Sequence, residues 1–233
     1  LRRRRPLDES GRADFGVIQA ATLTLLGLII GFTFSMASTR FDQRKVYEEE
    51  EANAIGTAYA RASLLPDADA AKLRTLLRDY LDQRIAFYVA REAEQVRASD
   101  ERVARLQGEM WSVVSAAARA QPTPPSALAV ASVNDVLNTQ GYTQAAWWNR
   151  IPVQAWTLMA AIAFCACVLV GYGTHDARIE SFMMPMLPLV VAIAFLLIAD
   201  IESPRSGTIS VTAQNLEALA QSLRAPPWGG AAP

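Results

Sequence analysis

The most constraining feature of this sequence is an uncharged apolar run near its N-terminus. Residues 16–38 contain no charged side chain, and basic residues flank the run, four at Arg2–Arg5 and three between residues 40 and 45. A helix of this length rises roughly 34 Å, enough to cross a hydrocarbon core of about 30 Å. The run continues directly into a charged helical pattern, unlike a cleaved signal peptide. The sequence therefore predicts a transmembrane helix at 16–38, after a basic membrane-flanking segment at 1–15.

Two later apolar stretches, at 151–171 and 182–199, are also long enough to span a bilayer. The polar loop between them, at 172–181, is short, so we expect an antiparallel transmembrane hairpin. Two prolines fall in the first turns of the last span, where a missing backbone donor costs least. We expect the remaining residues, 200–233, to form a tail with one short amphipathic helix.

The polar region at 39–150 reads as helix, with no strand alternation. We expect one helix from Asp42 towards Leu65 and a long one from Ala70 to Ala120, ended by a proline cluster. The long helix carries an apolar stripe that another helix must cover, with charged residues, Arg84 among them, on its other side. An amphipathic segment then leads back to the membrane. Three tryptophans there are expected to lie at the headgroup level: Trp147, Trp148 and Trp156.

The motifs of catalysis are absent from the sequence. It contains no P-loop, dinucleotide-binding turn, nucleophile elbow or His-Glu-x-x-His pattern. Cys165 and Cys167 lie two residues apart inside an apolar run and cannot close a normal disulfide, and His175 is the only histidine. We therefore expect neither an enzyme nor a cofactor or metal site. The formal net charge of -1, with acids and bases interleaved, also argues against a nucleic-acid partner.

Four consecutive glutamates, Glu48, Glu49, Glu50 and Glu51, follow the first apolar run. Carboxylates near a membrane exit can attract cations at a pore mouth, or they can simply solvate one face of a helix. The simpler interpretation is the solvated face, and the sequence leaves both open.

Three segments carry a family resemblance: GFTFSMASTRF at 31–41, EEANAIGTAYARASLLP at 50–66 and IADIESPRSGT at 198–208. They resemble the bestrophins, which are pentameric ion channels, and more closely a bacterial bestrophin-like membrane family. The resemblance implies an all-α, bestrophin-like fold of transmembrane helices plus a long extramembrane helical bundle. It implies that the first span lines a pore.

In bestrophins the pore neck is a ring of apolar residues at i, i+4 and i+8, ending on the Phe of a Gly-Phe pair. By this resemblance the neck is Thr24, Leu28 and Phe32, with a hydroxyl at Thr24 where bestrophins keep a branched apolar residue. The pore exit and flank then hold Arg40 and the four glutamates. The motif after the last span comprises Asp200, Glu202, Pro204, Arg205 and Gly207.

The sequence also departs from the bestrophin pattern. Bestrophins have four spans, whereas three are predicted here, which leaves room for a further span before Leu1. The calcium-binding acidic cluster of animal bestrophins is reduced to Asp200 and Glu202, which argues against calcium gating. Positive-inside counting places residues 39–150 in the periplasm, whereas the resemblance places them in the cytoplasm. We favour the cytoplasm, and the conflict stays open.

These observations together predict a bacterial inner-membrane ion channel. We expect a homo-oligomer, a pentamer by the resemblance, in contact with the lipid bilayer and conducting small monovalent inorganic ions through an apolar neck. The alternative is a membrane-anchored helical sensor or scaffold without transport activity, because the order of span, helical bundle and span is also that of bacterial receptors. A transporter is disfavoured by the lack of charges within the spans.

Overall fold

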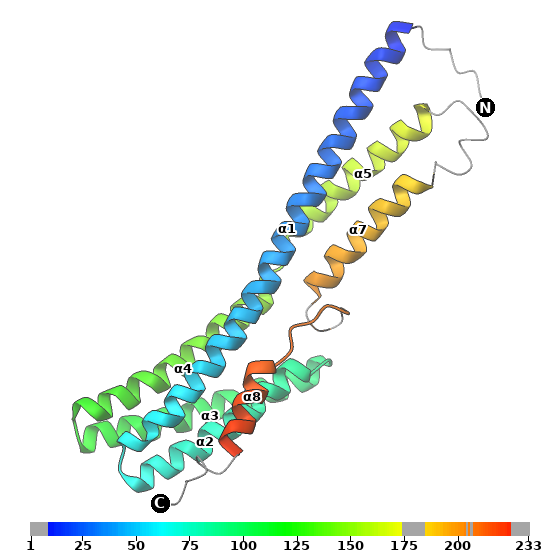
Figure 1. The fold of residues 1–233 in the computed structure, drawn as a ribbon. Helices are drawn as coiled ribbons and strands as arrows, with labels where there is room; N and C mark the ends of the chain where they lie inside the picture. Colours follow the sequence, from blue (N-terminus) through cyan, green and yellow to red (C-terminus); the bar gives the residue numbers. More distant parts are fainter. Residues whose placement is uncertain (1–8, 174–184, 204, 206, 225–233) are drawn as a thin grey trace, which may run out of the picture. The chain divides into compact units, whose positions relative to one another are not determined.

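The computed structural model of the chain describes residues 9–173, 185–203, 205 and 207–224. All regular structure in these residues is helical, which confirms the all-α class (Figure 1). The elements are α1 (Glu9–Arg61), the 3-10 helix η1 (Ala62–Leu64), α2 (Asp67–Val89), α3 (Ala93–Ala120), α4 (Pro124–Trp148), α5 (Val153–Gly173), α7 (Met186–Glu202) and α8 (Gln214–Arg224). Several predictions fall outside the described residues: those on Arg2–Arg5, His175, Pro204 and the end of the tail.

Helix α1 is one uninterrupted helix of 53 residues, about 80 Å long at 1.5 Å per residue. The predicted span and the predicted helix that follows it are thus a single element. No proline or glycine occurs between Phe32 and Ile55, so nothing there breaks the hydrogen-bond ladder. The α-helix ends at Arg61, a few residues before the predicted end, and η1 continues to Leu64. The helical conformation then stops because Leu65 takes the extended conformation that Pro66 imposes on its predecessor.

The chain divides into two compact units. Unit 1 contains residues 9–39 and 150–202, and unit 2 contains residues 40–149 together with the described part of 203–224. The segment after the last apolar helix therefore belongs to the same unit as the polar region.

Unit 1 consists of the first part of α1 with α5 and α7. Its core joins Leu26 of α1 to Ala163 and Ala166 of α5 and to Val191 of α7. Small alanines at such contacts allow apolar helices to approach closely. The last residue of α5, Gly173, packs against α1 so tightly that a Cβ there would lie 2.8 Å from the Cε1 atom of Phe15.

Two helical stretches, within Ser10–Leu64 and Pro124–Gly173, are long and apolar enough to cross a membrane. Only 6% and 17% of the residues in their most apolar windows are buried. A core helix of a soluble protein would bury most of such a window. Helix α7 is equally apolar in sequence but is 17 residues long as described, and the part of the predicted span before Pro185 lies outside the described residues.

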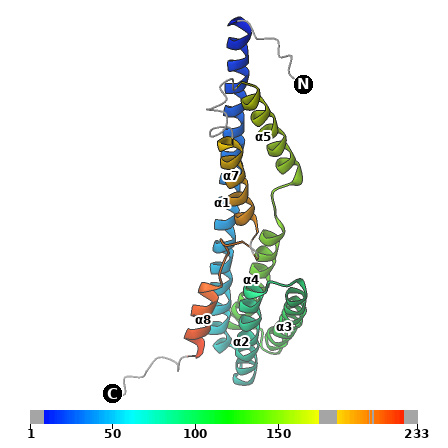
Figure 2. The same ribbon diagram turned by 90° about the vertical axis from the view of Figure 1, so that its right-hand side faces the viewer.

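Unit 2 is a helical bundle in which α2 packs along α3, α3 along α4, and the short α8 against α2 (Figure 2). The apolar stripe predicted on α2 forms its core, with Leu73, Leu77 and Leu81 buried. The expected single helix from Ala70 to Ala120 is wrong, because the chain leaves the helical conformation at residues 90–92 and turns back as α3. Helix α2 also begins earlier, at Asp67.

The turn between α3 and α4 follows the expected proline cluster. Thr123 caps α4, its hydroxyl accepting from the backbone N–H of Ser126, whose own hydroxyl accepts from the N–H of Thr123. This reciprocal pair is a capping box. Pro124 takes the first helical position, where its missing N–H is harmless.

Candidate functional site

The apolar part of α1 has one packed face and one exposed face. Leu26 and Ala37 are buried, and at about 100° per residue they fall on the same side of the helix. Thr24, Leu28 and Phe32 lie on the opposite side and are exposed, Leu28 by 52% and Phe32 by 65%. The three residues predicted for the neck therefore share one face that the described part of the chain does not cover.

The residues predicted to flank the pore differ in burial. Glu48 and Glu51 are buried in unit 2, whereas Glu49 and Glu50 are exposed. Arg40 is half-buried and lines a groove between α1 and α4. Because residues three apart share a helix face, Glu48 and Glu51 lie on the buried face and the two residues between them on the exposed face. Only Glu49 and Glu50 remain available to a solvent-filled exit.

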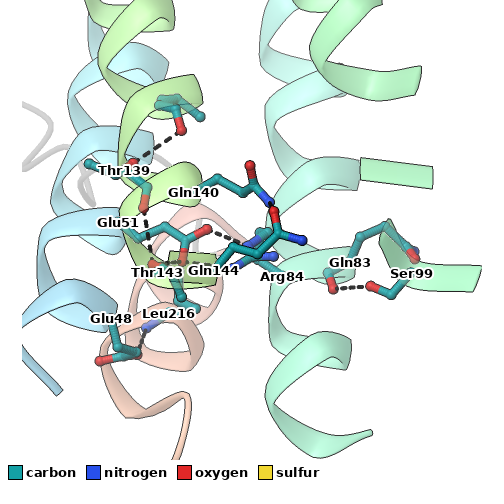
Figure 3. Close-up of polar contacts among 11 residues, drawn as sticks. Glu48, Glu51, Gln83, Arg84, Ser99, Thr139, Gln140, Thr143, Gln144 and Leu216 are labelled. Atoms are coloured by element: carbon teal, nitrogen blue, oxygen red, sulfur yellow. Dashed lines mark hydrogen bonds and ion pairs between the residues drawn. The ribbon is translucent and has the colours of Figure 1, made fainter. Parts of the chain in front are cut away.

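Glu51 joins three helices at one buried carboxylate (Figure 3). Arg84 of α2 donates from Nε to Oε1 and from Nη2 to Oε2, the latter at 3.2 Å. Thr143 of α4 donates its hydroxyl to Oε2 at 3.3 Å. Two parallel N–H donors on one carboxylate give both strength and a fixed orientation. Glu51 therefore fixes the position of α1 relative to α2 and α4.

The surroundings of this ion pair shift the pKa values of neighbouring groups. Burial lowers the pKa of Arg84, but the charge and hydrogen bonds of Glu51, together with the charges of the phenols of Tyr80 and Tyr88, outweigh burial, so the pKa is raised. Burial and the negative charge of Glu51 raise the pKa of Tyr80 above its ordinary range, and the same causes raise that of Tyr88. At neutral pH the centre of unit 2 thus holds a charged pair among neutral phenols.

Glu48 holds the beginning of α8. Its Oε1 atom accepts from the backbone N–H groups of Asn215 and Leu216, both at 2.9 Å, and its Oε2 atom accepts from Nδ2 of Asn215 at 2.6 Å. The first N–H groups of a helix lack intrahelical partners, and a carboxylate is well suited to accept from them. The first turn of α8 is thus fixed to α1.

Arg205, from the motif after the last span, caps the end of α2. Its Nη1 atom donates to the carbonyl oxygens of Phe87 and Ala90, at 2.8 and 2.9 Å. Its guanidinium lies 4.5 Å from the ring centres of both Phe87 and Trp147. Because Trp147 is buried in this cluster, it is not exposed at a headgroup level as predicted, whereas its neighbour Trp148 is exposed.

The rest of that motif has local roles in the structure. Glu202 is buried at the end of α7, and its Oε2 atom accepts from the backbone N–H of Ile151, just before α5, at 2.8 Å. Gly207 donates its N–H to the carbonyl of Ser203 at 2.9 Å. Asp200, at the end of α7, is half-buried.

Sequence reasoning missed several polar residues that the structure buries, and three of them make contacts between helices of unit 2. Arg84 was placed on the charged side of its helix, yet it lies three and seven residues after Leu81 and Leu77 and so continues the apolar stripe. Arg44 donates to the carbonyls of Ala146 and Asn149 at the end of α4. The third is Thr143. The spacing of Arg84 could have indicated its burial, whereas nothing in the sequence around Arg44 or Thr143 indicates theirs.

Within the described ranges, no group of three or more His, Cys, Asp or Glu residues is placed to hold a metal ion. Cys165 and Cys167 are both free thiols.

The sequence matches the Bestrophin-like domain family over residues 5–216. No curated protein matches it significantly.

The fold is similar to solved structures of bacterial bestrophin homologues. A homologue from Klebsiella pneumoniae carrying an isoleucine-to-threonine mutation is 14% identical, with a TM-score of 0.63, and the match covers 89% of this chain and 84% of that one. A structure of that homologue phased on zinc is 16% identical, with a TM-score of 0.60 over 91% and 84% of the two chains. A membrane protein with a leucine-to-alanine mutation is 12% identical, with a TM-score of 0.67 over 89% and 84%.

At such identities these structures show the fold alone, and the two bestrophin homologue structures confirm its bestrophin-like class. The family match shows more than the fold, because it is a match of sequence that extends over most of the chain. It makes this an integral membrane protein of a kind related to channels rather than enzymes, and the protein belongs to the Bestrophin-like domain family.

Proposed function

We propose that the protein is an ion channel built from identical copies, five by analogy with bestrophins, in the bacterial inner membrane. Helix α1 of each copy lines the pore, and small monovalent ions pass. The observation that carries this proposal is the exposed apolar face of α1 at Thr24, Leu28 and Phe32. Membership of the family supports it.

A ring of Leu28 and Phe32 side chains forms an apolar constriction. Ions cross such a constriction only when it is wide enough to be wetted, so the neck can gate by dewetting. The hydroxyl of Thr24 makes one end of the neck easier to wet. Beyond the neck, the exposed Glu49 and Glu50, with Arg40, form the flank of the exit.

The test is single-channel current from purified protein in lipid bilayers, with Phe32→Ala and Leu28→Ala. We expect both substitutions to change the conductance or the gating, because they widen the apolar ring. The matched controls are Phe164→Ala on α5 and Leu196→Ala on α7, whose side chains are 71% and 70% exposed. These remove exposed apolar side chains of the same two kinds from helices that do not line the proposed pore.

If Phe32→Ala and Phe164→Ala changed the current equally, the proposal that the neck lies on α1 would be contradicted. A well-folded wild-type oligomer that passes no current at any tested voltage or pH would overturn the channel proposal and favour the sensor or scaffold. The mass of the detergent-solubilised protein tests the oligomer, and a monomer would contradict it.

A further inference from the structure

The C-terminal helix α8 packs back onto the helix that we propose lines the pore. Leu216 and Ala220 of α8 are buried in the core of unit 2. At Gly56 of α1 an added Cβ would lie 3.3 Å from Leu219 Cδ1, so a glycine there permits the close approach of α8. An exposed ion pair between Arg224 and Asp82, at 3.0 Å, lies at the other end of α8.

The helical state of α8 depends on Glu48. With 11 residues, α8 is too short to be a stable helix alone in water. Ala213, which precedes it, has no side-chain acceptor for the first N–H groups. The Glu48 carboxylate supplies that acceptor from a helix more than 160 residues away in sequence. Loss of this contact therefore removes the cap of α8 and one of the contacts that hold it on α1.

We propose that α8 is a releasable clasp on α1, held by Glu48, and that its docking sets the open probability of the channel. The inference rests on the proposed function and adds a regulatory element to it. The physical basis is that Glu48 and the neck residues are carried by the same helix, α1. Release of α8 leaves the neck side chains unchanged and alters the restraint on α1, so we expect it to affect opening rather than conductance.

The first measurement is hydrogen–deuterium exchange of residues 214–224 in the full-length protein in detergent or nanodiscs. In Glu48→Ala we expect exchange there to rise by about tenfold, in line with the loss of a helix cap. Exchange in α3, against which α8 does not pack, should stay unchanged. Glu48→Gln should fall between wild type and Glu48→Ala, because its amide oxygen can still accept from the N–H groups of Asn215 and Leu216.

The second measurement is single-channel recording of the same variants. We expect Glu48→Ala to change the open probability at least threefold and to leave the unitary conductance unchanged, with Glu48→Gln intermediate. Removal of residues 214–233 should reproduce the effect of Glu48→Ala. The control is Glu109→Gln, which removes an exposed carboxylate on α3 and should affect neither measurement.

The two measurements separate the possible failures. Unchanged exchange in α8, or released α8 with unchanged open probability in a conducting channel, overturns the clasp and leaves the channel intact. A wild-type protein that never conducts overturns the channel, and the exchange data then decide alone whether Glu48 holds α8. If Glu48→Ala does not fold, Asn215→Ala removes only the 2.6 Å contact and should give a smaller shift of the same kind.

Discussion

Breaking the buried pair of Glu51 and Arg84 should cost far more stability than breaking an exposed pair on the same helix. Both side chains are essentially inaccessible to solvent. Glu51→Leu leaves the Arg84 guanidinium buried without its carboxylate, and Arg84→Met leaves the carboxylate without its fork of donors. Removal of one partner of a buried pair typically costs about 3–5 kcal/mol. For a chain of this size that corresponds to a fall in Tm of roughly 6–20 °C.

The double variant Glu51→Leu with Arg84→Met tests the physical reason. If the cost arises from an uncompensated buried charge, the double variant should lose less than either single variant, because neither charge remains. The control is Asp82→Asn, which breaks the pair with Arg224. Those side chains are 53% and 70% exposed, and such pairs contribute about 0–1 kcal/mol.

The assay is thermal unfolding of the detergent-solubilised protein, followed by tryptophan fluorescence and by loss of the oligomer peak in gel filtration. A double-mutant cycle over the four proteins gives the coupling energy. The reasoning is refuted if Glu51→Leu and Asp82→Asn shift Tm equally, or if the double variant loses the sum of the single losses. Either result would mean that no buried charge is left unpaired.

Two further predictions concern the surroundings of this pair. Arg205→Lys should lower the free energy of unfolding by about 1–3 kcal/mol and raise amide exchange at the end of α2. The reason is that lysine cannot both span two carbonyls and stack on two rings. The control, Arg91→Lys at an exposed position, should have neither effect. The raised pKa of Tyr80 means that above pH 10 the unfolded chain releases a proton that the folded chain keeps, so stability falls as pH rises. In Tyr80→Phe this loss should be smaller by up to about 1.4 kcal/mol per pH unit, and equal slopes in denaturant titrations at pH 10 and 11 would contradict it.

The helices of the chain were predictable wherever their signals are local. The uncharged run at 16–38 predicted the apolar part of α1, and the amphipathic pattern of the tail predicted α8. The helical conformation that includes η1 stops before Pro66 as expected, because proline acts through its own ring and missing N–H. These signals operate within a few residues of the element that they define.

The turn between α2 and α3 could not be predicted, because its stabilising groups are distant in sequence. Residues 90–92 contain no glycine or proline. The carbonyls freed where α2 ends are instead satisfied by Arg205, 115 residues away from Ala90. The burial of Trp147 has the same origin, since it stacks on that guanidinium. The neck and flank residues were predicted from the resemblance to bestrophins, and their roles stay predictions.

The division of the glutamate run also determines which substitutions related sequences can tolerate. Glu49 and Glu50 face solvent in this chain and can exchange with other polar residues at little cost in folding. Glu51 can change only together with Arg84, and Glu48 only together with the start of α8. Among homologues, the two inner positions of the glutamate run should therefore vary freely. The two outer positions should instead covary with their partners, Glu51 with the residue 33 places further along the chain and Glu48 with the residue 167 places further along.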